Sequence, residues 1–150
     1  MLLTLVLFIK RKFSIKDFFL EEKGDRVVPF LFIGAFYFAL AYMLFLPLNS
    51  VLFMVILGTA ILIILAGVIT TVWKISAHAI GIAGTVGFLL ALSRLYPAVN
   101  LLVPIIGIII AGGLVLSSRL YLNAHTPKQV LAGVLLGFSG SLLTVYFMLA

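Results

Sequence analysis

Long apolar runs alternate with short polar segments along the chain, and each long run predicts one membrane-spanning helix. The runs cover about residues 29–47, 50–73, 79–96, 99–117 and 127–150. A helix needs roughly 20 apolar residues to cross the hydrocarbon layer. The pattern therefore predicts an all-α, polytopic transmembrane helical bundle with about five full spans, folded as a single domain over residues 1–150.

Two further elements are expected before the first span. Residues 1–9 are apolar but too short to cross a bilayer, so they form the tail of a helix or a re-entrant or surface piece. Residues 14–23 predict a short interfacial helix, with Ser14 as its N-cap, Gly24 at its end and its apolar residues on one side. All four acidic residues lie between positions 17 and 25.

The connections between spans predict which loops share a face of the membrane. Leu48–Asn49 and Pro97–Ala98 are short and uncharged, so each joins two spans into a helical hairpin. Counting crossings then places the segment before the first span, the loop at Lys74 and the loop at 119–128 on one face. Every basic residue except Arg94 lies on that face, and the positive-inside rule favours a cytoplasmic position for it.

Composition supports a membrane protein and limits its partners. The 150 residues are 65% hydrophobic and only 9% charged, whereas soluble domains carry about 25% charged residues. The chain is expected to be an integral multi-pass cell membrane protein (of the inner membrane in a Gram-negative cell). Its net charge of +6 suits anionic lipid headgroups, and no nucleic acid is expected as a partner. The sequence does not indicate an oligomeric state.

The densest polar segment in the second half of the chain is residues 117–129. Thr126 predicts a helix N-cap, Pro127 the first helical position and Gln129 the partner of a capping box. His125 therefore lies just outside a helix N-terminus, where free N–H groups and the helix dipole favour an anion. Together with Arg119, this arrangement indicates phosphate chemistry, and a plain polar loop between two spans is the structural alternative.

Two other polar segments are expected on the same face. Residues 74–78 contain Lys74, Ser76 and His78, and Ser76 predicts the N-cap of the following helix. Lys23 and Arg26 precede the first span. Cysteine is absent, and neither histidine has an acidic residue or a second histidine at metal-ligand spacing, so no metal site is expected.

These residues resemble the signatures of the type 2 phosphatidic acid phosphatase superfamily. Ser118-Arg119, five residues, His125, three residues and Gln129 is similar to the third signature, Ser-Arg-x5-His-x3-Asp. Residues 75–78, Ile-Ser-Ala-His, resemble the second signature, Pro-Ser-Gly-His. The first signature, Lys-x6-Arg-Pro, is echoed only by Lys23, Arg26 and Pro29. The chain departs from the family pattern at Ile75, at Ala77 and at Gln129, which stands where the family has aspartate.

The resemblance implies an enzyme that hydrolyses a phosphomonoester or pyrophosphate of a membrane lipid through a phosphohistidine, without metal or cofactor. By match with the motifs, His125 would be the nucleophile, His78 the general acid and Gln129 the residue that orients His125. The phosphoryl oxygens would be held by Arg119 and Ser76, with further contributions from Lys74, Arg26 and Lys23.

Two other functions remain open at this point. A catalytically weak or inactive family member could bind a lipid phosphate or a partner protein in the same pocket, because Gln129 cannot supply the charge of the aspartate. A small transporter or assembly subunit is disfavoured, since no span carries an ionisable residue at mid-depth.

Overall fold

The computed structural model describes residues 23–45 and 50–149, with side chains over 27–43 and 51–147. Five helices make up these segments: α3 (Lys23–Phe45), α4 (Ser50–Val72), α5 (Ala77–Leu95), α6 (Leu102–Tyr121) and α7 (Pro127–Leu149). The predicted all-α class is confirmed. The expected apolar segment at 1–9 and nearly all of the expected interfacial helix at 14–23 lie outside the described residues.

Four of the helices, α4 to α7, are long and apolar enough to cross a membrane. Helix α3 adds an apolar stretch from Val27 to Met43 within the residues whose side chains are described, and the helix itself continues to Phe45. Helix α3 begins ahead of Pro29, the position at which the first span was expected to begin. By length and composition, the described part of the chain thus holds four candidate spans and one shorter apolar helix.

The expectation that Gly24 ends a helix is wrong, because Gly24 lies in the first turn of α3. Pro29, which has no N–H, removes one backbone hydrogen bond further along the helix. Helix α3 includes both residues, and it also includes Lys23 and Arg26, which were expected to precede the first span.

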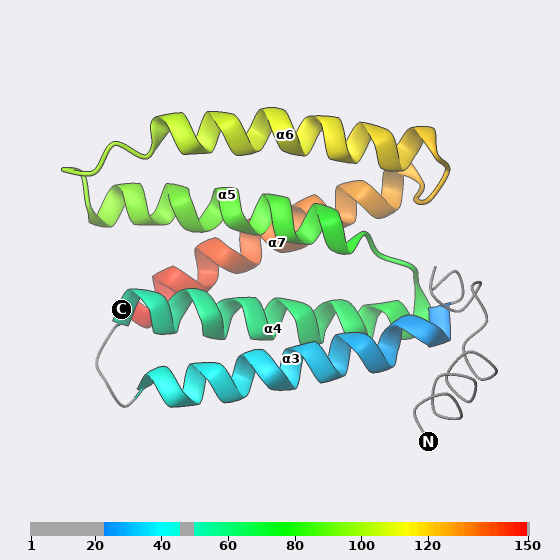
Figure 1. Ribbon diagram of the computed structural model, residues 1–150, viewed down its shortest axis with the longest axis horizontal. Helices are drawn as coiled ribbons and strands as arrows, with labels where there is room; N and C mark the ends of the chain where they lie inside the picture. Colours follow the sequence, from blue (N-terminus) through cyan, green and yellow to red (C-terminus); the bar gives the residue numbers. More distant parts are fainter. Residues whose placement is uncertain (1–22, 46–49, 150) are drawn as a thin grey trace, which may run out of the picture.

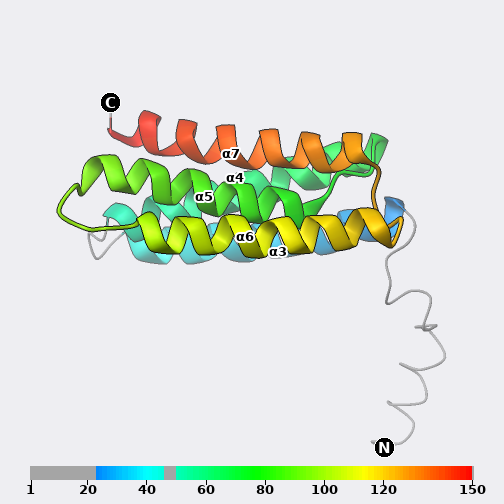
Figure 2. The same ribbon diagram turned by 90° about the horizontal axis from the view of Figure 1, so that it is seen from above.

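The helices form two antiparallel pairs with the last helix packed across them. Helix α3 packs on α4 and α5 packs on α6, while α7 contacts both α5 and α4 (Figures 1 and 2). The ends of α4 and α6 and the starts of α3, α5 and α7 therefore lie together (Figure 1). We call this the polar end of the bundle, because the connections at 73–76 and 122–126 lie there.

Two glycines of α7 bring its backbone against the first turns of α5. A Cβ added at Gly133 would lie 2.7 Å from the Ser76 carbonyl oxygen and 2.8 Å from the Ala79 Cβ. A Cβ added at Gly137 would overlap the Ile80 carbonyl oxygen. Small residues four apart let membrane helices approach this closely. The contact fixes the N-terminus of α7 beside the N-terminus of α5.

A small apolar core lies directly beneath the connection between α4 and α5. Its buried members are Leu62 and Ala66 of α4, Ile75 of the connection and Ile80 of α5. Ile75 is only 2% exposed, so it anchors this connection in the bundle. The core therefore holds the residues that follow Ile75 in a fixed place at the polar end.

Candidate active site

A compact turn at the end of α6 sets the distance between Arg119 and His125. The Ala124 N–H donates to the Arg119 carbonyl, and the Asn123 N–H donates to the Leu120 carbonyl, both at 3.0 Å. Asn123 has φ 52°, a left-handed conformation that asparagine tolerates better than most residues. These features are those of a Schellman motif, which ends a helix and reverses the chain. Asn123 was not among the predicted site residues, although asparagine after a helical run signals such an end.

Helix α7 begins with the predicted capping box. The Gln129 N–H donates to Thr126 Oγ1 at 3.4 Å, and the Thr126 N–H donates to Gln129 Oε1 at 3.1 Å. The same Gln129 oxygen also contacts His125 Nδ1, at 3.3 Å. His125 is only 8% exposed. One oxygen of Gln129 therefore completes the capping box and also accepts a hydrogen bond from His125. The capping role and the contact with the histidine occur together.

This shared oxygen indicates that Nδ1 of the His125 ring carries a proton. The Gln129 atom accepts the Thr126 N–H, so it is the amide oxygen, and His125 Nδ1 must be the donor in the second contact. In a neutral imidazole only one nitrogen carries a proton, so Nε2 keeps its lone pair. An unprotonated ring nitrogen is what nucleophilic attack requires.

At the start of α5, Ser76 acts as the predicted N-cap. Its hydroxyl accepts the Ala79 N–H at 3.4 Å, and its carbonyl accepts the Ile80 N–H at 3.1 Å. Ser76 is fully buried. The cap satisfies one of the N–H groups of the first turn and holds His78, the second residue of α5, at the polar end. The role of Ser76 as a phosphate ligand stays a prediction.

Arg119 joins the two histidine-bearing segments. Its Nη2 donates to His78 Nε2 at 2.9 Å, across 41 residues of sequence. A guanidinium has no acceptor, so His78 Nε2 accepts and carries no proton in this state. The Arg119 Nε is buried and has no hydrogen-bond acceptor among the described residues. Buried donors are nearly always paired, so this N–H is placed to receive an acceptor that the described residues do not supply.

The remaining predicted ligands, Lys74, Lys23 and Arg26, belong to segments at the same end of the bundle. Lys74 belongs to the connection before Ser76. Lys23 and Arg26 lie in the first turns of α3, at the polar end, and their side chains are outside the described residues (Figure 1). Among the residues that the structure describes, no three His, Cys, Asp or Glu side chains gather in a way that could hold a metal ion.

The structure thus brings together His78 with Arg119 and His125 with Gln129, at the adjacent starts of α5 and α7. Comparison with known proteins agrees with the resemblance noted in the sequence. The family model described as the PAP2 superfamily matches residues 73–150. The match covers α5 to α7, with the second and third signatures, and leaves out Lys23 and Arg26. No curated protein and no solved structure matches the chain. Because the family model spans more than half of the sequence, the chain belongs to the PAP2 superfamily.

Proposed function

We propose that the protein is a multi-pass cell membrane phosphatase that hydrolyses a lipid phosphomonoester or pyrophosphate through a phosphohistidine, without a metal ion. Members of its family generally hydrolyse phosphate esters. A lipid substrate suits a membrane protein whose polar residues gather at one end of an apolar bundle. Membrane lipids are then its partners, both as solvent and as substrate.

The observation that carries the proposal is the position of Arg119. Its guanidinium donates to His78 with one nitrogen, and its buried Nε has no acceptor among the described residues. Guanidinium groups match the geometry of phosphate oxygens and bind them with two parallel hydrogen bonds. The starts of α5 and α7 add two helix dipoles of the sign that favours an anion. A phosphoryl group at this place satisfies the unpaired N–H and both dipoles.

In the first step, the Arg119 N–H groups donate hydrogen bonds to the phosphate of the substrate in place of His78 Nε2. His78 Nε2 can then bind a proton. His125 Nε2 attacks phosphorus, a P–N bond forms and the P–O bond to the lipid breaks. The departing lipid oxygen takes the proton from His78. Gln129 continues to accept the Nδ1 proton of His125, which keeps the ring in place while it gains positive charge.

In the second step, water hydrolyses the phosphohistidine. His78, now neutral, takes a proton from the water as its oxygen attacks phosphorus. The P–N bond breaks, and phosphate leaves with His125 again neutral. Positioned donors around the phosphoryl oxygens contribute most of the catalysis in such transfers.

The proposal predicts phosphate release by the purified wild-type protein from a panel of lipid phosphates in the presence of EDTA. The residues invoked supply the nucleophile, the acid and the anion-binding donors themselves, so chelation should leave the rate unchanged. The measurement is free phosphate over time in mixed micelles. No release from any lipid phosphate, while one of them still binds, would instead favour an inactive family member that binds lipid phosphate or a partner protein.

Gln129 provides a second test, because its oxygen serves two contacts. Gln129→Glu keeps the length of the side chain and adds a negative charge beside the ring that becomes positive. We expect the rate to rise several-fold, because charge-assisted hydrogen bonds are roughly twice as strong as neutral ones. Gln129→Ala should lower the rate by roughly tenfold or more, because the ring loses its orienting partner. Both are measured as kcat on one lipid phosphate.

If Gln129 only capped the helix, the same variants would give different values of kcat and thermal stability. Gln129→Glu would then leave kcat unchanged, since a glutamate also completes the capping box. Gln129→Ala would lower the thermal stability by the cost of the lost cap contact, with no separate effect on kcat. That combination would contradict the orienting role of Gln129.

A further inference from the structure

The turn between α6 and α7 is closed by a hydrogen bond to the backbone of Arg119 itself. The Ala124 N–H donates to the Arg119 carbonyl at 3.0 Å. Within the same turn the Leu122 N–H donates to the Ser118 carbonyl, also at 3.0 Å. Ala124 directly precedes His125 in the sequence. The backbone of Arg119 is therefore tied to the neighbour of His125, independently of any contact between their side chains.

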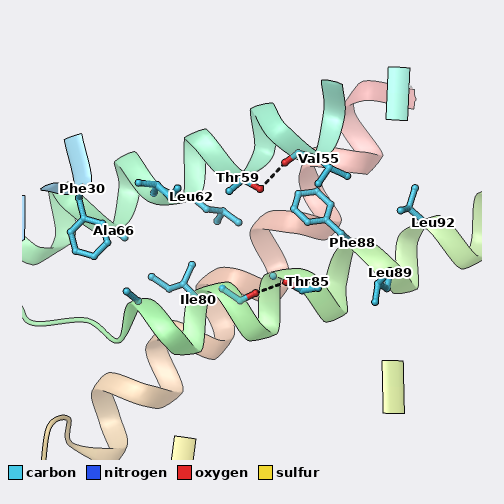
Figure 3. Close-up of a pocket in the computed structure, with 14 residues that line it drawn as sticks. Phe30, Val55, Thr59, Leu62, Ala66, Ile80, Thr85, Phe88, Leu89 and Leu92 are labelled. Carbon is cyan, nitrogen blue, oxygen red and sulfur yellow. Dashed lines mark hydrogen bonds between the residues drawn. The ribbon is translucent and has the colours of Figure 1, made fainter. Parts of the chain in front are cut away.

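Helix packing provides no second link of this kind. Helix α6 packs on α5, and α7 packs on α5 and α4, so α5 lies between α6 and α7 (Figures 1 and 2). Among the described helices, α6 and α7 form no comparable contact with each other. An apolar cavity of about 420 Å³ also separates part of α5 from α4 (Figure 3). The turn is thus the direct connection between the helix that carries Arg119 and the helix that begins after His125.

The closed turn depends on the backbone conformation of Asn123. Within the described part of the chain, Asn123 is the one residue other than glycine with a positive φ, at 52°. A residue in this left-handed conformation reverses the chain at a helix end, which lets the N–H groups that follow reach back to the last turn. Asparagine enters this conformation more readily than most residues with a side chain. The Asn123 side chain is exposed, so the residue contributes its conformation rather than a packing contact.

We infer that Asn123 is a positioning residue for phosphoryl transfer. Its left-handed conformation closes the turn, and the closed turn sets the distance between the Arg119 guanidinium and His125 Nε2. The inference rests on the proposed function, in which Arg119 holds the phosphoryl group that His125 attacks. Asn123 acts through these two residues and not through a contact with the substrate. A misplacement of about 1 Å can cost a hundredfold in rate, so an open turn lowers turnover even in a folded protein.

Substitutions at position 123 can open the turn or keep it closed. Valine is β-branched and disfavours a positive φ, so Asn123→Val should open the turn. Glycine adopts a positive φ without steric cost, so Asn123→Gly should keep it closed. Both variants lack the asparagine side chain, and a difference between them therefore reports the backbone conformation. Asn123→Ala disfavours a positive φ less strongly than valine does, and it carries the same test if the valine variant does not fold.

Asn100→Val is the matched control for the loss of an exposed asparagine beside a helix end. Asn100 precedes α6 at the end of the bundle opposite the candidate site (Figure 1). Its side-chain oxygen accepts the Leu102 N–H at 3.1 Å, and the residue is exposed. Asn100→Val removes this contact at a helix start but leaves the turn at Asn123 intact. It should lower stability slightly and leave kcat and KM as in wild type.

The kinetic test measures kcat and KM on one lipid phosphate in detergent micelles, at a temperature at which thermal unfolding shows each variant to be folded. Asn123→Val should lower kcat by roughly tenfold to a hundredfold. The value of kcat/KM should fall equally, because the geometry of attack is lost while binding of the lipid is kept. Asn123→Gly should retain most of the wild-type kcat. Lower stability of Asn123→Val with an unchanged kcat would mean that Asn123 only ends α6, and it overturns the inference.

Two further readouts need no catalysis. The Ala124 amide should exchange its hydrogen slowly in wild type and Asn123→Gly, because it is bonded to the Arg119 carbonyl, and faster in Asn123→Val. Orthovanadate resembles phosphate and accepts a fifth ligand, as phosphorus does during attack, so its tight binding needs Arg119 and His125 in place together. Calorimetry should show that Asn123→Val binds orthovanadate at least roughly tenfold more weakly than wild type and Asn123→Gly.

These readouts separate the positioning role from the proposed function. If wild type binds orthovanadate but hydrolyses no lipid phosphate, a loss of affinity in Asn123→Val supports the positioning role and removes the phosphatase. If wild type is active, and Asn123→Val loses the protection of Ala124 but keeps its kcat, the positioning role is overturned and the phosphatase stands. Slow exchange of Ala124 in Asn123→Val also overturns it, because the turn then does not depend on Asn123. A wild type without turnover and without orthovanadate binding removes both.

Discussion

Replacement of His125 by alanine abolishes phosphate release, with an expected fall in kcat of roughly a thousandfold or more. Three properties of this side chain suit it to act as the nucleophile. Its Nδ1 donates to the Gln129 oxygen, its Nε2 keeps a lone pair and its ring is nearly buried at the start of α7. Alanine removes the atom that would form the P–N bond, and no neighbouring contact replaces it.

The same variant also removes a contact at a helix start, so the chemical effect needs a control. Thr126→Ala breaks the capping box at the Thr126 hydroxyl but keeps the histidine. It should lower stability by about 1 kcal/mol while most of the activity remains. Quenching a reaction of labelled lipid phosphate in alkali should trap label on wild type and none on His125→Ala. Activity of His125→Ala within tenfold of wild type, or label on another residue, removes the nucleophile assignment.

Replacement of Gly137 by alanine should unfold or strongly destabilise the protein. The added Cβ would overlap the Ile80 carbonyl oxygen, and it would lie 2.9 Å from both the carbonyl carbon and the Cα of Ile80. These are backbone atoms of α5, so no side chain can turn aside, and the two helices must separate. Overpacking in a core typically costs about 1–3 kcal/mol, and a clash between backbones should lie at or above the top of that range. Thermal unfolding in detergent measures the loss.

Gly113 provides the control for this substitution. It is a helical glycine of α6, and a Cβ added there meets nothing within 4 Å. Gly113→Ala should leave the melting temperature unchanged or raise it slightly, because alanine is favoured over glycine in a helix by roughly 0.5–1 kcal/mol. Equal melting temperatures of the Gly137 and Gly113 variants would contradict the close contact of α5 and α7.

Local patterns were enough to predict much of the fold. The hydrophobic runs predicted the helices, because the backbone N–H and C=O groups of a segment in lipid must form hydrogen bonds within that segment. The start of α7 was predicted through Thr126 and Gln129, and the start of α5 through Ser76, because a cap depends on residues three apart. Gly24 was a poor guide to a helix end, because a single glycine is also tolerated within a helix at a cost of about 1 kcal/mol.

The candidate site was only partly predictable. Spacing identified His125 and Gln129 as possible partners, since they are four residues apart across a helix start. The contact between Arg119 and His78 joins residues of different helices, and it depends on how α5 and α6 pack. No periodicity in the sequence reports the space between α4 and α5. Tertiary packing decides both features, and a single sequence carries no direct record of it.

The close packing of α5 and α7 has an electrostatic consequence. Both helices begin at the polar end, so they run parallel, and Gly133 holds their first turns in contact. Each helix N-terminus carries the equivalent of roughly half a positive charge, so the fold keeps two like partial charges side by side. Their repulsion opposes folding, and a bound phosphate would relieve it. Under the proposed function, relief of this repulsion would contribute to the affinity for the phosphate.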